Sequence, residues 1–179
     1  VNRRLATHYR LPEVAGQKMR KVSLPANSPR GGLLTHASIH KLTANGTFTS
    51  PVKRGAYILT HLLGEAPEPP PPNVGSVEPD TRGATTIRET LDKHRNMESC
   101  AQCHRSIDPP GFALESFDPI GGFRWHYRAG TTKGERRPYR QGLKVDASGE
   151  TPVGDTFANI WEYKRLLTRK NDQIPLHFI

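Results

Sequence analysis

The chain has few cysteines, few methionines and little apolar character. It holds two cysteines and two methionines among 179 residues; hydrophobic residues make up 34%, and the mean hydropathy is −0.66. The second Cys/His pair at short spacing that a structural zinc site normally requires is missing. No stretch is long and apolar enough to span a bilayer. The composition therefore predicts one moderate core, or a small domain with a long extension, and no transmembrane segment.

The chain is basic, yet it is not patterned for nucleic acids. The formal net charge is +9 and the pI is about 9.9. Lysines and arginines are scattered, and neither a stacking platform nor a groove-reading motif accompanies them. Clusters such as Arg3-Arg4 and Arg136-Arg137 are typical of solvated faces. The charge therefore predicts an acidic protein partner or an anionic surface, and no nucleic acid.

Both cysteines fall in one short run, Cys100-Ala101-Gln102-Cys103-His104. In this C-x-x-C-H pattern two thiols bond covalently to the vinyl groups of haem, and the adjacent imidazole ligates the iron. The two intervening residues let both sulfurs reach neighbouring vinyls and bring the histidine beneath the metal. The run therefore predicts one covalently attached haem c, held by Cys100 and Cys103, with His104 as the proximal iron ligand.

Three other chemistries could use the same residues. A thioredoxin-like C-x-x-C gives no role to the following histidine, and it belongs to a strand-to-helix context. A zinc site needs a fourth ligand. A structural disulfide between Cys100 and Cys103 would close a very small loop. Covalent haem is the favoured interpretation.

The sequence is organised around a proline run at residues 65–72. Its prolines favour polyproline II geometry and predict a stiff spacer. We therefore expect an N-terminal helical extension over residues 1–64, a Pro-rich linker over 65–80 and a haem domain over 81–179 whose C-terminal helix is truncated. The predicted fold is mainly α, with a small β excursion.

Capping signals and apolar spacing predict several helices. Ser50-Pro51 opens one that ends before Gly64, and the capping box from Thr86 to Glu89 opens another that runs to about Met97. A turn and a short helix are expected between Ile107 and Asp118. The remaining expectations are helices over residues 2–10, 33–42 and 156–170, a strand over 123–128, and a Gly-rich β excursion up to Gly149.

The residues after His104 are expected to surround the haem. A carbonyl of Pro109 or Pro110 is predicted to accept the second ring N–H of His104, the type of contact that orients a ligand histidine. Phe112, Leu114 and Phe117 are predicted to form an apolar wall.

The second axial ligand is left open by the sequence. His36, flanked by the small Ala37 and Ser38, is the first candidate for the distal ligand, and His94 is a weaker one. His40, His61 and an open site are further alternatives. Spacing alone does not select a partner for His104.

Several segments together resemble the cytochrome-c-like C-terminal modules of large planctomycete-type multidomain proteins of unassigned function. The resemblance covers residues 5–173. It implies a cytochrome c-like haem domain downstream of further domains in an extracytoplasmic assembly. An insert at 131–140 and the missing final helix depart from the family pattern. The matching segments are 29–35, 49–55, 62–64, 91–95, 107–109, 111–115 and 146–149.

These features predict a mono-haem c-type cytochrome module that transfers single electrons. Its expected partners are other domains or subunits of a larger redox assembly. Haem attachment to C-x-x-C-H takes place outside the cytoplasm in bacteria, which predicts a periplasmic or otherwise extracytoplasmic location. Val1 starts no signal peptide, so we expect a processed chain or a fragment. A peroxidase-like or oxidase-like haem enzyme and a module with a structural haem are the alternatives.

Overall fold

The computed structural model describes residues 1–70, 72, 83–95, 98–131 and 139–169. This described part is mainly α-helical with two small antiparallel sheets, as the composition and capping signals predict. None of its helices has the length and apolar character needed to cross a membrane. Its elements are α1 (Arg3–Tyr9), the 3₁₀ helix η1 (Leu33–Thr35), α2 (Ala37–Leu42), α3 (Pro51–Ile58), the π-helical turn η2 (Leu59–Leu63), α4 (Ile87–His94), α5 (Glu98–Ala113), β1 (His126–Ala129), β2 (Arg140–Lys144), β3 (Gly149–Glu150), β4 (Thr156–Phe157) and α6 (Ile160–Arg169).

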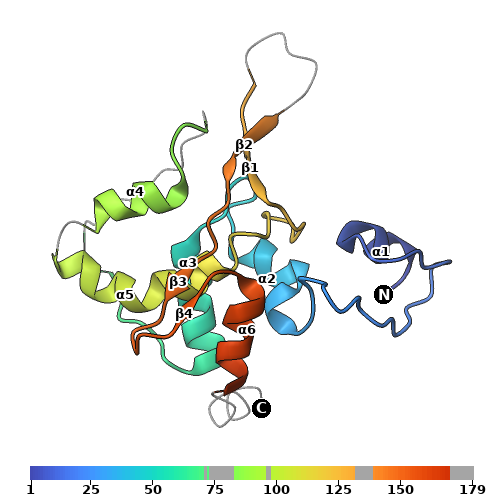
Figure 1. Ribbon diagram of the computed structural model, residues 1–179, viewed down its shortest axis with the longest axis horizontal. Helices are drawn as coiled ribbons and strands as arrows, with labels where there is room; N and C mark the ends of the chain where they lie inside the picture. Colours follow the sequence, from blue (N-terminus) through green and yellow to red (C-terminus); the bar gives the residue numbers. More distant parts are fainter. Residues whose placement is uncertain (71, 73–82, 96–97, 132–138, 170–179) are drawn as a thin grey trace.

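Helix α5 runs from one edge of the molecule, below α4, toward the centre, while α1 and α4 lie at opposite sides (Figure 1). Strands β1 and β2 form an antiparallel ribbon in which His126 lies opposite Lys144. Strands β3 and β4 form a second antiparallel pair. The core lies where α3, α5 and α6 meet.

The predicted signals at both ends of α3 are confirmed. The Ser50 side chain accepts a hydrogen bond from the Lys53 N–H, and Pro51 is the first helical residue. The helix continues into η2 and ends at Gly64, which has φ 71° in the left-handed region. Glycine tolerates that conformation at little cost, so it ends the helix there.

Two glycines let α3 and α5 approach each other at backbone distance. A Cβ atom on Gly55 would lie 1.7 Å from the carbonyl oxygen of Ile107. A Cβ atom on Gly111 would lie 1.9 Å from the carbonyl oxygen of Pro51. Both separations are far below van der Waals contact, so only glycine permits this helix pairing. The pairing fixes the orientation of α5, and with it the direction in which the C-x-x-C-H run faces.

One hydrophobic core joins segments from both sides of the proline run. Ile58 and Leu62 precede the run, and they pack in the same cluster as Leu114, Phe117 and Ile160. The boundaries predicted at residues 64 and 80 stay a prediction. What the structure adds is that the region around α3 and the region around α5 are buried against each other.

Three predicted elements have different bounds. The helix expected over residues 33–42 is divided at His36, whose extended backbone (φ −72°, ψ 131°) separates η1 from α2. The strand expected over 123–128 is paired as β1 only from His126. The last helix begins at Ile160, because Thr156 and Phe157 pair with β3 as strand β4.

The turn expected around Pro109 and Pro110 is wrong. Helix α5 continues through both prolines to Ala113. Each proline removes one backbone N–H and disfavours helical geometry in the residue before it, so a break was the natural expectation. Tertiary packing outweighs that preference, since every residue from Ile107 to Asp118 is buried and Gly111 lies against α3.

Candidate haem-attachment site

The two thiols and the imidazole lie on one face of the N-terminal half of α5. Cys100, Cys103 and His104 are at positions i, i+3 and i+4 of this helix, which share a face. Cys100 is half-buried, Cys103 is exposed, and neither cysteine forms a disulfide. Within the described residues, no three His, Cys, Asp or Glu side chains converge as metal ligands. The two thiols and the imidazole are therefore presented together on one side of α5.

The ring of His104 is oriented by Asp108, one turn further along the same helix. The Nδ1 atom of His104 lies 2.8 Å from Oδ1 of Asp108. The Asp108 side chain is completely buried, and 14% of the His104 side chain is exposed. Donation from Nδ1 to the carboxylate leaves Nε2 as the nitrogen that can ligate a metal.

This contact corrects the expectation that a carbonyl of Pro109 or Pro110 would hold the ring. Because α5 does not turn at the prolines, the residue four positions after His104 faces the same side of the helix. That residue is Asp108. The signal was present in the sequence as a His/Asp pair at i,i+4 spacing, and it was missed because a turn was expected there.

Arg95 brings the end of α4 to the second oxygen of Asp108. Its guanidinium NH1 lies 3.4 Å from Oδ2 of Asp108. Arg95 follows the last residue of α4 and also pairs with Asp92, three residues earlier. The Asp108 carboxylate therefore has an imidazole on one oxygen and a guanidinium near the other.

Arg88 connects α4 to α5 and to the loop before β3. Its Nε lies 2.9 Å from Oδ2 of Asp146, and the same guanidinium donates to the carbonyl oxygen of Ser148. The guanidinium carbon also lies 3.8 Å from the centre of the Phe112 ring, within cation–π range. Burial lowers the pKa of Arg88, while Asp146 raises it.

The comparisons with known proteins give one match. The model of the family described as "PSCyt3: Protein of unknown function (DUF1588)" matches residues 30–127, more than half of the chain. The chain belongs to this family. Neither the search of curated proteins nor the search of solved structures gave a match. The matched part of this PSCyt3 protein runs from the residues before η1 through α5 to β1, so it includes the C-x-x-C-H run.

The structure places the predicted wall residues of the PSCyt3 protein in its interior. Phe112 is 2% exposed beneath Arg88. Leu114 and Phe117 are fully buried in the core shared with α3 and α6. Pro110 is buried next to Gly111 on α5. A role for these residues in lining a haem stays a prediction.

The structure does not bring His36 and His104 together. His36 is exposed at the start of α2, and the next residue, Ala37, lies against Gly121. Helix α2 lies beyond the C-terminal end of α5, whereas the C-x-x-C-H run begins at the other end (Figure 1). The nine residue-to-residue steps from His104 to Ala113 alone span about 14 Å of helix. His94 ends α4, and its side chain lies outside the described part.

His40, one of the sequence alternatives, is completely buried and stacks on Phe117 with ring centres 4.6 Å apart. Neither ring nitrogen makes a hydrogen bond of ordinary geometry to a described residue. Burial, with Arg54, Arg30 and Arg124 next in effect, lowers the pKa of His40 to about 2. This imidazole therefore stays neutral in the folded protein at ordinary pH.

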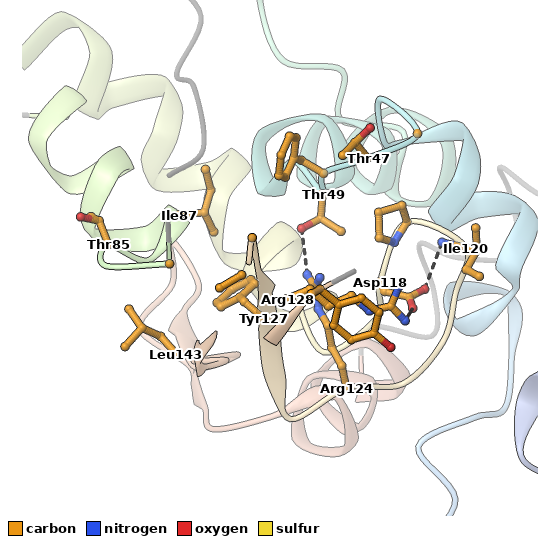
Figure 2. A pocket seen from close by; sticks show the side chains of 17 residues that line it. Thr47, Thr49, Thr85, Ile87, Asp118, Ile120, Arg124, Tyr127, Arg128 and Leu143 are labelled. Atoms are coloured by element: carbon orange, nitrogen blue, oxygen red, sulfur yellow. Dashed lines mark hydrogen bonds and ion pairs between the residues drawn. The ribbon is translucent and has the colours of Figure 1, made fainter. Parts of the chain in front are cut away.

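A cavity of about 440 Å³ lies apart from the C-x-x-C-H run, between the loop before α3, the start of α4 and β1 (Figure 2). Its charged side chains are paired within the protein: Arg124 with Glu115 at 3.2 Å, and Arg128 with Asp118 at 3.5 Å. Neither this cavity nor the smaller one beside His36 is lined by the two cysteines or His104.

Proposed function

We propose that this PSCyt3 protein is a mono-haem c-type cytochrome module that transfers single electrons in an extracytoplasmic protein or complex. The observation that carries the proposal is the bond between His104 and Asp108 on the helix face that also bears both free cysteines. An oriented imidazole directly after a C-x-x-C pair is what covalent haem ligation requires. The family description, which contains no assigned function, is compatible with it.

Each residue of the site has a separate task in this proposal. Cys100 and Cys103 attach the cofactor, and Nε2 of His104 ligates its iron. The haem supplies the redox-active metal. Asp108 fixes the ring orientation, and the contacts of Arg88 hold α4 next to α5. A cytochrome c-like fold around the haem belongs to the same proposal.

The proposed location and partners follow from chemistry and charge. Haem attachment to C-x-x-C-H takes place outside the bacterial cytoplasm, so we propose a periplasmic or comparable compartment. The net charge of +9 favours docking to an acidic electron-transfer partner, because opposite charge speeds encounter. Other domains or subunits of a larger redox assembly are the partners we expect.

Expression of the whole chain with export and haem-attachment machinery tests the proposal. Intact-mass measurement should show the chain plus one haem, and a pyridine haemochrome spectrum should show two saturated vinyl positions. Cys100→Ala and Cys103→Ala should each leave one vinyl unsaturated or lose the haem. His104→Ala should disturb axial ligation, while the matched His126→Ala, in β1, should leave the spectrum unchanged. A chain that remains at its bare peptide mass contradicts the proposal.

A second measurement separates electron transfer from catalysis. A low-spin, six-coordinate spectrum that does not respond to cyanide or peroxide supports the electron-transfer function. A high-spin spectrum that changes with either ligand indicates an open site and favours the haem enzyme.

A further inference from the structure

We propose that Asp108 is a positioning residue that makes His104 a strongly electron-donating ligand and thereby lowers the reduction potential of the site. This inference rests on the proposed function, because it concerns the iron that His104 would ligate.

The geometry concentrates the charge of Asp108 on one hydrogen bond. The carboxylate is 0% exposed, and Oδ1 lies 2.8 Å from Nδ1 of His104. The other oxygen, Oδ2, is buried and accepts no hydrogen bond from a described residue; the nearest guanidinium atom, of Arg95, is 3.4 Å away. Water is excluded from this carboxylate, so a large part of its basicity acts on the histidine.

An anionic acceptor affects a ligand histidine more than a neutral carbonyl does. Hydrogen bonds to ionised groups are about twice as strong as neutral ones, and they are stronger still in a buried setting. A carboxylate that accepts from Nδ1 pulls the proton away from the ring and raises the electron density on Nε2. Greater donation stabilises the oxidised metal over the reduced one, so the reduction potential falls.

Arg95 provides an opposing adjustment on the same carboxylate. Its guanidinium draws charge toward Oδ2 and away from the bond to His104. Its side chain is 28% exposed, so it can be replaced without opening the core. We therefore expect the reduction potential to shift in opposite directions when Asp108 and when Arg95 loses its charge.

Redox titration of the haem-loaded chain tests these signs. Asp108→Asn keeps the size and an acceptor oxygen but removes the charge, so the midpoint potential should rise by the equivalent of at least a tenfold change in the one-electron equilibrium, 59 mV. Arg95→Gln should lower it. Asp108→Glu, which restores the charge, should return it toward the wild-type value. Asp92→Asn is the matched control, since Asp92 also pairs with Arg95 but does not touch His104, and it should shift the potential much less.

The ¹⁵N resonance of Nδ1 in the unloaded chain gives an independent readout. Asp108→Asn should move that resonance toward a weaker hydrogen bond, and Asp92→Asn should leave it in place. If circular dichroism shows that Asp108→Asn does not fold, two other measurements test the role of Asp108. They are the change in midpoint potential caused by Arg95→Gln and the Nδ1 resonance of His104 in the wild-type chain.

The outcomes separate the two proposals. A wild-type chain that holds no haem overturns the proposed function. If haem is attached, either of two results overturns only the role of Asp108: equal shifts for Asp108→Asn and Asp92→Asn, or a rise in potential for Arg95→Gln.

Discussion

Arg54 of α3 and Glu115, two residues beyond the end of α5, form an ion pair in which both side chains are completely buried. NH1 of Arg54 lies 3.3 Å from Oε1 of Glu115. The same guanidinium donates to the carbonyl oxygens of Leu114, Phe117 and Asp118 at 2.7, 2.8 and 3.2 Å. These carbonyls lie just past the C-terminal end of α5, where a cation is favourable, and those of Leu114 and Asp118 also accept from backbone N–H groups. The pair thus fixes the chain after α5 to α3.

Loss of the Arg54 charge should destabilise the protein strongly. Arg54→Met keeps much of the volume, but it removes the buried cation that neutralises Glu115 and donates to three carbonyl oxygens. Thr49 still donates to Glu115, and backbone N–H groups still donate to the Leu114 and Asp118 carbonyls. Breaking a buried pair in this way costs about 3–5 kcal/mol; Arg124, which also contacts Glu115 at 3.2 Å, keeps the expected loss near the lower figure. Urea unfolding measures this loss in the free energy of unfolding. Arg165→Ala removes an exposed pair with Glu162 and should cost less than about 1 kcal/mol; similar losses for both variants would contradict the prediction.

A methyl group at position 55 should separate α3 from α5. Gly55→Ala places Cβ 1.7 Å from the carbonyl of Ile107, which is backbone and cannot rotate away. The helices must move apart, at an expected cost of about 3 kcal/mol or more. Lys53→Ala is the control, since Lys53 is exposed on the same helix and should change stability by about 0.5 kcal/mol at most. Thermal melts that place both variants near the wild type would show that the helices do not approach this closely.

Buried His40 should make the protein less stable in acid. Its pKa is about 2 in the folded state and near 6.5 when the chain is unfolded, so the unfolded state takes up the proton first. The contribution of neutral His40 to the free energy of unfolding is therefore present above pH 6.5 and is lost as the pH falls. The loss between pH 7 and pH 5 should be about 2 kcal/mol. We expect the free energy of unfolding, measured with urea at several pH values across this range, to fall less steeply with decreasing pH in His40→Leu than in the wild type. The control is His61→Leu at an exposed position, and it should keep the wild-type pH dependence. If stability falls equally steeply with pH in His40→Leu and in the wild type, His40 is not the source of the pH dependence.

Local sequence signals were sufficient to predict helix ends, because a few neighbouring residues determine the backbone conformation there. Ser50-Pro51 and Gly64 enclose α3 and η2, and the Thr86–Glu89 capping box begins α4 with both of its hydrogen bonds formed. Such signals depend on side chains within one helical turn of the end, so no tertiary information is needed.

The features that the sequence did not predict depend on packing between distant segments. Helix α5 passes through Pro109 and Pro110 because it is buried against α3. The sequence from His104 to Ala113 contains no local signal that predicts this burial. The same continuation turns Asp108 toward His104, where a break would have turned it away. His36 was favoured for its small neighbours, a local criterion that does not report which end of α5 it faces.

Arg88 should control how firmly α4 holds Arg95 next to Asp108. The Arg88 guanidinium contacts Asp146, the Ser148 carbonyl and the Phe112 ring, so Arg88→Ala removes three links between α4 and the rest of the protein. Because its side chain is 23% exposed, we expect a loss of about 2 kcal/mol in global stability. Amide hydrogen exchange should speed up most in α4, whose opening is then less costly than global unfolding. Lys93→Ala, at an exposed position of the same helix, should leave α4 exchange unchanged. Equal acceleration in α3 and α4 would show that Arg88 stabilises the whole core and not the attachment of α4, and it would remove the link between Arg88 and the environment of His104.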